Sequence, residues 1–178
     1  MEINMKRVLV VGCPGSGKSY IAKKLSELTS IPVVHLDQYY WLPGWRRIDN
    51  SEWSDIVDNL VSKPTWIMDG NYSGTLAMRL VSADTVIHLD YPTWLCIWRV
   101  IRRTMIGWRG NRGNELAPGC EERFDLAFLV FVFNYRKKYR ERDLAKMADF
   151  PGQLYRFTSP SALTAFVNEL RKTMQEKT

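Results

Sequence analysis

The sequence predicts an α/β fold in which helices cover both faces of a five-stranded parallel sheet. Short apolar runs rich in β-branched residues alternate with segments whose apolar residues follow helical spacing. The connections between these segments are short, as in chains built from β-α-β units. The 178 residues, 46% of them hydrophobic, are enough for one domain with a buried core, so residues 1–178 are expected to form a single domain.

The elements expected along the chain are strand 7–11, helix 17–28, strand 32–36, helix 51–62, strand 65–68, helix 74–81, strand 85–89, helix 92–108, helix 121–148, strand 153–157 and helix 161–174. The first strand is the apolar run RVLVV, and the first helix places Ile21, Leu25 and Leu28 on one face. The stretch HLDQYYWLPGW, residues 35–45, fits neither a strand nor a helix.

Several helix ends carry a local signal. Ser51 suits an N-cap, Pro92 sits where a helix can begin, and Ser159 or Ser161 suits the cap of the last helix. LAFLVFVF, residues 126–133, has the composition of a strand, but its flanks extend it as a helix, so a helix is expected. Four glycines and a proline make residues 107–119 a loop.

The sequence shows no membrane-spanning or targeting segment. Its longest apolar run has eight residues, far below the roughly 20 that a transmembrane helix needs. The N-terminus leads into a strand without a signal-peptide pattern. The three cysteines lack metal-site spacing and indicate reduced thiols. We therefore expect a cytoplasmic protein with no membrane partner.

The net charge of +6 is confined to one segment. Residues 98–142 contain eleven Lys or Arg and five Asp or Glu, whereas the rest of the chain is balanced. A basic block of this kind favours a polyanionic partner, either nucleic acid or a nucleoside triphosphate. A solvated helix face is the simpler alternative.

The loop after the first strand, GCPGSGKS, matches G-x-x-x-x-G-K-[ST] at every defined position. Its glycines let backbone N–H groups approach phosphate oxygens, and the following helix adds its positive N-terminal end. Lys18 is expected to reach the β- and γ-phosphates of ATP, and the Ser19 hydroxyl to bind Mg²⁺. The expected nucleotide-binding residues are Gly12, Cys13, Pro14, Gly15, Ser16, Gly17, Lys18, Ser19 and Tyr20.

A second metal-binding acid is expected at the end of a neighbouring strand. Asp69, in WIMDGNYSG, ends the third strand and is the predicted Mg²⁺ partner of Ser19, the alternative being an aspartate that caps the short helix after it. Asp90 also ends a strand, but the Tyr-Pro after it starts a helix, so a capping role is expected there. His35 and His88 each precede a strand-end Leu-Asp and are interpreted as packed structural residues.

These motifs occur in the order seen in P-loop nucleotide and metabolite kinases, and the chain resembles the adenylate-kinase-like group. That resemblance implies a three-layer P-loop NTPase fold, strand order 2-3-1-4-5, and a helical lid at about residues 105–122. HLDQYYWLPGW, DGNYSGTLAMRL, LDYPTWLCIWR and GCEERFDLAF further resemble the bacterial family labelled "DNA topology modulation protein". The resemblance spans nearly the whole chain.

The chain departs from adenylate kinases at the acceptor side. Those enzymes have Asp-Gly-Phe-Pro-Arg after the third strand, and the arginine holds the acceptor's phosphate. Here the matching stretch is Asp-Gly-Asn-Tyr-Ser, residues 69–73, without an arginine. AMP is therefore not the expected acceptor, and a lid metal is not expected because four-cysteine spacing is missing.

The resemblance implies phosphoryl transfer from ATP with Mg²⁺, in which lid arginines stabilise the charge on the γ-phosphate. The expected catalytic residues are Lys18, Asp37, Arg99, Arg103 and Arg123, with Arg109, Arg112, Arg136 and Arg140 as further candidates. Adenine is expected near residues 158–160.

Asp37 follows the second strand and is expected to orient or deprotonate an acceptor hydroxyl. The expected acceptor-binding residues are Asp37, Tyr40, Trp45, Asp69, Gly70, Asn71, Tyr72 and Arg79. The aromatic residues among them either stack on a flat ring or pack in the interior. A nucleoside or nucleotide is the first candidate acceptor, and a polar metabolite is the second.

Two other functions remain open from the sequence. One is a nucleic-acid-binding or DNA-topology-modulating NTPase, supported by the basic block and a pI near 9.3 but lacking a recognisable DNA-reading motif. The other is a protein that binds ATP without transferring phosphate. Either a monomer or a homodimer fits, and LAFLVFVF is an interface candidate if it is exposed.

Overall fold

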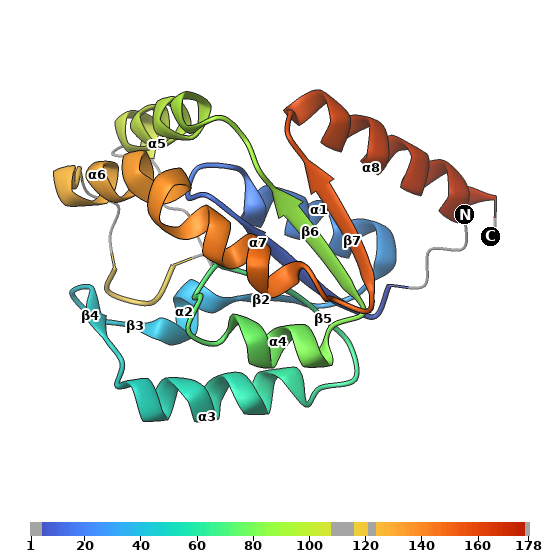
Figure 1. The fold of residues 1–178 in the computed structure, drawn as a ribbon, viewed down its shortest axis with the longest axis horizontal. Coiled ribbons are helices and arrows are strands. Elements are labelled where there is room, and N and C mark those ends of the chain that lie inside the picture. The colour runs from blue at the N-terminus through green and yellow to red at the C-terminus, as the bar shows by residue number, and fades with distance from the viewer. Residues whose placement is uncertain (1–4, 108–115, 121–123, 177–178) are drawn as a thin grey trace.

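The computed structural model describes residues 5–107, 116–120 and 124–176. Within them, five parallel strands form the central sheet in the order β2-β5-β1-β6-β7 (Figure 1). The strands are β1 (Arg7–Gly12), β2 (Val33–His35), β5 (Trp66–Asp69), β6 (Thr85–Leu89) and β7 (Gln153–Phe157). Counted along the chain, this order is 2-3-1-4-5, which confirms the predicted topology.

Helices cover both faces of the sheet, as predicted (Figure 1). One face packs against α1 (Lys18–Thr29) and α8 (Pro160–Gln175), and the other against α3 (Asn50–Val61), α4 (Leu76–Ser82) and α7 (Glu141–Met147). The helices α5 (Thr93–Gly107) and α6 (Leu126–Tyr135) pack against each other at the end of the sheet where the strands finish.

Alternation along β1 builds the two layers of the core. Val8 and Val10 pack into the cluster that contains α1 and α8, whereas Leu9 and Val11 pack into the cluster that contains α3 and α4. Successive side chains of a strand point to opposite faces, so a fully apolar strand is buried on both sides. This central position places the loop that follows β1 between the ends of β5 and β6.

The stretch at residues 35–45, which fitted no single element, begins at the last residue of β2 and contains a short helix, a short strand and the turn of a hairpin. A short helix, α2 (Leu36–Tyr40), leads into a two-stranded antiparallel hairpin of β3 (Trp41–Leu42) and β4 (Arg46–Arg47). Gly44 and Trp45 have positive φ values of 75° and 62° in the turn. Elements this short carry too few residues for hydrophobic periodicity to reveal them.

Helix ends confirm one predicted cap and correct another. Ser159 Oγ accepts a hydrogen bond from Ala162 N at 3.3 Å, so Ser159 caps α8. The prediction for Ser51 is wrong, because α3 begins at Asn50 after Asp49 and Ser51 lies inside the first turn.

The long helix expected at 121–148 is present from Leu126 to Met147 as α6, a π-helical turn η2 (Arg136–Arg140) and α7. LAFLVFVF is therefore helical, as expected. Residues 121–123 lie outside the described part, as does most of the predicted lid at 105–122. Among the described residues, no helix has the length and apolar character to cross a membrane.

Candidate active site

The loop GCPGSGKS, residues 12–19 (the P-loop), joins β1 to α1 and needs glycine at two close contacts. Gly12 and Gly15 have φ values of 147° and 83°. A Cβ on Gly12 would lie 2.5 Å from Leu89 O, and one on Gly15 would overlap Cys96 O. Either side chain would push the loop away from β6 and α5. The N-terminus of α1, at Lys18, faces the loop it follows.

Two side chains of the P-loop fit a bound phosphate. The Ser16 hydroxyl is buried and has no hydrogen-bond partner among the described residues, and a phosphate oxygen would satisfy it. Lys18 Nζ donates to Gly12 O at 3.0 Å and to Cys13 O at 3.3 Å. Burial lowers the pKa of Lys18, whereas Asp69 and, more weakly, Asp37 raise it. Both acids therefore lie close enough to act on the ammonium group.

The remaining residues predicted to bind the nucleotide differ in exposure. Cys13 is buried, Pro14 and Gly17 are partly buried, and Tyr20 is exposed on α1. No structural contact supports a role for the Tyr20 side chain, and its role stays a prediction.

Ser19 and Asp69 meet where the sequence predicts a magnesium site. Ser19 Oγ donates to Asp69 Oδ2 at 2.6 Å, because parallel pairing of β1 with β5 brings Val10 opposite Asp69. A hydroxyl and a carboxylate are oxygen ligands of the kind Mg²⁺ prefers. The described residues hold no cluster of three His, Cys, Asp or Glu. Magnesium commonly binds with one or two protein ligands beside phosphate and water oxygens, so the donor set fits it.

His35 holds the other oxygen of this carboxylate, which the sequence did not reveal. Its Nδ1 lies 2.6 Å from Asp69 Oδ1, and strand pairing sets His35 opposite Asp69. Both side chains are buried. The available signal was the position of His35 at the end of the strand next to that of Asp69, but it depended on knowing that these strands are neighbours.

Asn71 ties the P-loop to the long helical segment. Gly12 N donates to Asn71 Oδ1 at 2.8 Å, and Asn71 Nδ2 donates to Tyr135 Oη at 2.7 Å. The Tyr135 hydroxyl in turn donates to Asp143 Oδ2 at 2.9 Å. Asn71 was predicted to contact the acceptor, but in the structure both its amide oxygen and its amide nitrogen form hydrogen bonds within the protein.

Asp37 lies beside Tyr72, at the carboxyl end of β2. The Tyr72 hydroxyl donates to Asp37 Oδ1 at 2.5 Å. Burial, followed by the charge of Asp37, raises the pKa of Tyr72, so its phenol remains a donor at neutral pH. Asp37 is partly exposed, and no hydrogen bond to its Oδ2 from a described residue is observed.

The aromatic residues around Asp37 pack mainly on one another. The rings of Tyr40 and Tyr72 are 4.5 Å apart, and Trp53 lies 5.1 Å and 5.0 Å from them. Trp45 packs edge-on against Trp41 at 5.5 Å and is partly exposed. For Tyr40 and Tyr72, the packing alternative is the better supported.

The expectation that Arg79 binds an acceptor phosphate is corrected. Its side chain is 0% exposed, and its guanidinium donates to the carbonyl oxygens of Gly70, Asn71 and Tyr72. Burial lowers its pKa to about 10, with Asp143 opposing the shift. Arg79 therefore holds the loop after β5 from beneath. Gly70, with φ 138°, is buried in that loop against Leu36.

Only some of the predicted catalytic arginines lie within the described residues. Arg99 Nη1 donates to Ser16 O at 3.0 Å, and its guanidinium lies 5.5 Å from the ring centre of Tyr91. Arg103 is partly buried on the same helix. Arg123, Arg109 and Arg112 lie outside the described residues, so their roles stay predictions. The structure thus brings Arg99 to the P-loop.

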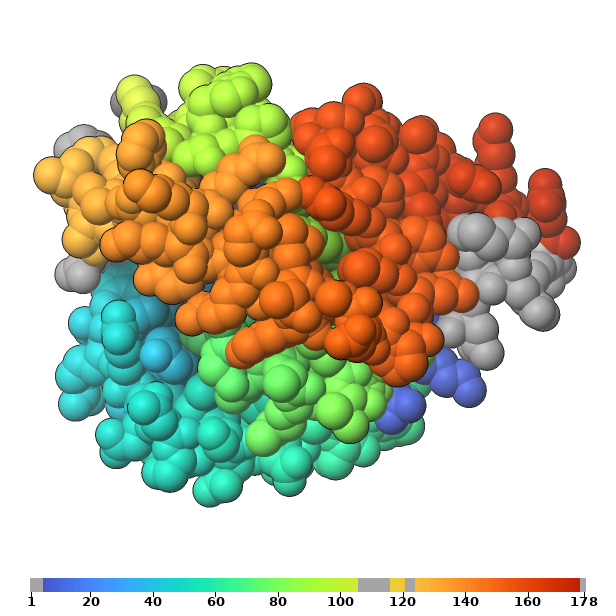
Figure 2. Space-filling view, viewed as in Figure 1, coloured from blue at the N-terminus to red at the C-terminus, as the bar shows by residue number. Residues whose placement is uncertain are grey.

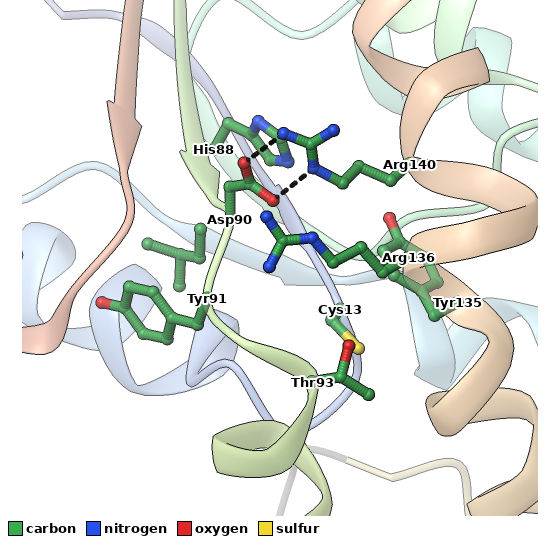
Figure 3. Close-up of a pocket in the computed structure, with 9 residues that line it drawn as sticks. Cys13, His88, Asp90, Tyr91, Thr93, Tyr135, Arg136 and Arg140 are labelled. Atoms are coloured by element: carbon green, nitrogen blue, oxygen red, sulfur yellow. Dashed lines mark hydrogen bonds and ion pairs between the residues drawn. The ribbon is translucent and has the colours of Figure 1, made fainter.

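A small pocket adjoins the P-loop on the side of β6 and the π-helical turn (Figure 3). Cys13, Asp90 and Thr93 line it together with two arginines, Arg136 and Arg140. Arg140 donates to both carboxylate oxygens of Asp90, at 2.8 and 2.9 Å. Arg136 extends toward the pocket from the helix, and among the described residues it forms no hydrogen bond or ion pair.

Asp90 is held by two arginines and does not cap the following helix, contrary to expectation. Arg156 from β7 also donates to Asp90 Oδ2, at 3.0 Å through Nε and 2.5 Å through Nη2. Burial raises the pKa of Asp90, but the hydrogen bonds from Arg140 and Arg156 outweigh it and bring the pKa to about 2. Both oxygens of Asp90 are thus engaged by arginines, whereas those of Asp69 are engaged by a hydroxyl and an imidazole.

The described end of the predicted lid, residues 116–120, contacts the hairpin. Gly44 N donates to Gly119 O at 3.0 Å, and Cys120 Sγ donates to Leu42 O at 3.3 Å. Residues 116–120 therefore lie against the β3-β4 hairpin.

Comparison with known proteins supports the fold. No protein-family model and no curated protein matches the chain. Among solved structures, shikimate kinase from Acinetobacter baumannii in complex with shikimate is similar with a TM-score of 0.57 and 14% identity, covering 98% of this chain and 95% of that one. Shikimate kinase from Bacteroides thetaiotaomicron is similar with a TM-score of 0.52 and 14% identity, covering 96% and 99%.

These likenesses, at low identity, define a fold: the chain has the three-layer α/β fold of P-loop small-molecule kinases. The resemblance to the family labelled "DNA topology modulation protein" is not supported by any family model and stays a prediction.

Proposed function

We propose that this protein is a Mg²⁺-dependent kinase that transfers the γ-phosphoryl group of ATP to a hydroxyl of a small molecule. The observation that carries the proposal is the convergence of three strand ends. The P-loop after β1, Asp69 at the end of β5 and Asp37 just after β2 lie at one edge of the sheet. Ligands of open α/β sheets bind at this edge.

The donor side consists of a cradle for phosphate and a metal-binding pair. Lys18, the free hydroxyl of Ser16 and the backbone of the P-loop would contact phosphate oxygens. Ser19 and Asp69 would hold Mg²⁺, and His35 keeps Asp69 in position through its second oxygen. Magnesium bound there would offset negative charge on the transferring phosphoryl group.

The acceptor side is organised around Asp37. Tyr72 holds one carboxylate oxygen and leaves the other to accept a hydrogen bond from the acceptor hydroxyl. Asp37 would orient that hydroxyl and take its proton as the O–P bond forms. Arg99, and Arg136 from the opposite side of the P-loop, would add positive charge near the transferred group.

The acceptor is proposed to be a small polar metabolite with a hydroxyl group. The solved shikimate kinases, one of them bound to shikimate, support this class. The burial of Arg79 removes one of the predicted phosphate anchors, which weighs against a nucleotide acceptor. A nucleoside remains the second candidate class. The chemistry is proposed to take place in the cytoplasm.

The test is acceptor-dependent ADP release. The protein with Mg²⁺ and ATP is assayed against shikimate, other hydroxylated ring acids, polyols, nucleosides and nucleotides, with Lys18→Ala as the inactive control. We expect one class to stimulate ADP release and to yield a phosphorylated product by mass spectrometry. ADP release that depends on Lys18 but ignores every acceptor would show an ATPase instead.

A nucleic-acid-binding NTPase is the second candidate, supported by the basic block. The segments 93–107 and 126–140 carry seven Lys or Arg and no Asp or Glu. Duplex binding that falls steeply with salt and stimulates ATP hydrolysis would favour this reading over a metabolite kinase. Without such stimulation, the kinase proposal stands.

A further inference from the structure

The outer face of α5 carries a continuous apolar stripe. Trp94, Trp98, Ile101 and Met105 are spaced by four, three and four residues, so they share one helix face. All are exposed, Trp94 by 69% and Met105 by 71%. The buried residues of the same helix, Cys96 and Val100, lie on its other side. This stripe therefore faces solvent.

The neighbouring helix α6 carries a second such stripe. Leu126, Val130 and Phe133 follow the same spacing, and Leu126 and Phe133 are each 66% exposed. Val132 and Tyr135 bury the opposite side of the helix. A helix that is apolar all round is normally enclosed by protein or by lipid, and α6 is enclosed on one side only.

The two stripes, together called the α5-α6 patch, lie on neighbouring helices at an edge of the molecule. The helices pack against each other (Figure 1), and they lie at the outer edge in the space-filling view (Figure 2). Most of the large exposed hydrophobic side chains in the described residues belong to these helices or to Phe124 just before α6. Such a concentration of exposed apolar side chains on two neighbouring helices is typical of an interaction site.

Basic residues border the patch and acids are missing from both helices. Arg102 lies on the edge of the α5 stripe with its guanidinium 5.5 Å from the ring centre of Trp98. Lys137 and Lys138 lie in the π-helical turn that follows α6, and both are exposed. A partner for this surface must therefore be both apolar and negatively charged.

We propose that the outer faces of α5 and α6 dock on the surface of an anionic phospholipid bilayer. Tryptophan, phenylalanine and leucine side chains insert between headgroups, while lysine and arginine bind lipid phosphates, which is how interfacial helices associate with membranes. The proposal concerns attachment to a surface and is independent of the proposed kinase activity. It replaces the sequence-based expectation that no membrane is a partner.

A second copy of the chain fits this surface less well. A twofold interface would bring the same patch from both protomers together, since such contacts are self-complementary. The basic residues of one copy would then face those of the other, with no acid on either helix to pair with them. An anionic surface reverses this repulsion into attraction.

Vesicle co-sedimentation tests the proposal. The full-length protein is mixed with vesicles of phosphatidylcholine, with or without phosphatidylserine, at low and high salt. We expect binding to the mixed vesicles that weakens with salt. Trp94→Ser with Phe133→Ser, and separately Lys137→Glu with Lys138→Glu, should each lower binding by at least about tenfold.

Matched controls change exposed residues elsewhere. Val81→Ser, on α4, replaces an exposed apolar residue and Lys63→Glu with Lys172→Glu replaces two exposed lysines, and both variants should leave binding unchanged. Because all substituted side chains are exposed, the variants are expected to keep their urea midpoints. As a measurement free of that assumption, brominated acyl chains should quench tryptophan fluorescence of the unmodified protein, and less in Trp94→Phe.

Three results would overturn the proposal. One is no binding to phosphatidylserine vesicles. Another is binding that survives loss of Trp94 and Phe133, which would show simple electrostatic adsorption. The third is a concentration-dependent dimer in sedimentation velocity that the Trp94→Ser, Phe133→Ser variant abolishes, without vesicle binding, which would show that a second copy covers the patch.

Discussion

Asp37 and Tyr72 form a pair in which packing fixes a polar contact. Tyr72 has a positive φ of 33°, a conformation that a bulky side chain adopts only when its surroundings hold it there. Tyr40 and Trp53 pack against its ring, and Arg79 binds its carbonyl oxygen. The packing of these aromatic residues thus orients the Tyr72 hydroxyl toward the Asp37 carboxylate.

Substitutions in this pair test the proposed base. Asp37→Asn should retain ATP affinity and lower kcat by at least about 100-fold, because the hydroxyl loses its proton acceptor. Tyr72→Phe should lower kcat roughly tenfold, since it removes one hydrogen bond to a charged group. Steady-state kinetics and calorimetric ATP titration measure both effects, with the exposed Tyr39→Phe as control. Full turnover in Asp37→Asn would make Asp37 structural.

His88 predicts a dependence of stability on pH. Burial lowers its pKa from 6.5 to about 4, with Asp90 opposing the shift and the two arginines around Asp90 adding to it. The unfolded chain therefore binds a proton at this histidine before the folded chain does. Stability present above about pH 6.5 should be lost as the pH falls toward about 4, by up to about 3 kcal/mol.

The measurement is the free energy of unfolding in urea at several pH values. His88→Gln, whose amide does not titrate, should show a smaller loss across this window than the unmodified protein. Equal slopes in the two proteins would contradict the assignment. Below this window, Asp90 adds a further loss as the pH falls from about 4 toward about 2, because its pKa is also lowered in the folded state.

At the level of elements, the segment α6-η2-α7 reaches from the pocket to the loop after β5. Its π-helical turn, Arg136–Arg140, is a feature often found at functional sites. Tyr135, directly before this turn, binds Asn71 and Asp143, and Asn71 binds the backbone of the P-loop. The segment that follows the predicted lid is thereby linked to the phosphate cradle.

Tyr135→Phe tests this link. The substitution leaves Asn71 Nδ2 and Asp143 Oδ2 without their partner in a part-buried network, which should cost about 1–3 kcal/mol in unfolding free energy. Urea denaturation measures the loss. Tyr155→Phe is the matched control, since its hydroxyl binds the exposed Gln153, and it should change stability by less than about 0.5 kcal/mol. Equal effects of the two substitutions would contradict the network's importance.

For the molecule as a whole, we expect two strand-end acids to have different roles, Asp69 in Mg²⁺ binding and Asp90 in stability. Asp69 faces Ser19 and His35 at the centre of the sheet. Asp90 receives arginines from η2 and β7 and so joins three elements that are distant in sequence. Both acids lie at the end of a strand in the sequence, and only their hydrogen-bond partners in the folded protein distinguish them.

Asp69→Asn and Asp90→Asn should therefore have different effects, the first on nucleotide binding and the second on stability. Asp69→Asn should weaken Mg²⁺–ATP binding by at least about tenfold, because a neutral amide is a poor Mg²⁺ ligand. Asp90→Asn should leave that affinity unchanged but lower the free energy of unfolding by about 2–4 kcal/mol, since it leaves two arginines without their carboxylate. Calorimetry and urea denaturation distinguish them. Loss of nucleotide binding in both variants to the same degree would refute the division.

The strands of the central sheet were predictable because each falls in a short, largely apolar run between segments of helical spacing or loops. β6 and β7 were predicted with the bounds they have, and β1 within one residue. The short helix α2 and the hairpin after it were missed, since little more than one helical turn and strands of two residues carry no repeat that distinguishes them. The N-cap of α3 was predicted at Ser51 but lies at Asp49, because Asp, Asn and Ser are all favoured at N-caps and the sequence has one of each at residues 49–51.

The P-loop could be recognised from sequence because its residues are contiguous and each has a required property. Gly12 and Gly15 have no room for a side chain, and Lys18 and Ser19 follow them at fixed spacing. The acceptor side depends on contacts between distant segments. Arg79 has the charge of a phosphate ligand, and only its burial beneath the loop after β5 assigns it to the backbone.

By itself, the sequence determined the α/β class, the strand order through its resemblance, and the phosphate-binding loop, since these depend on local pattern and spacing. Tertiary structure decided the partners of the charged and aromatic side chains: His35 with Asp69, Tyr72 with Asp37, Asp90 with Arg140 and Arg156. The physical reason is that burial and pairing set the role of a polar group, and both arise only when segments far apart in the chain are brought together.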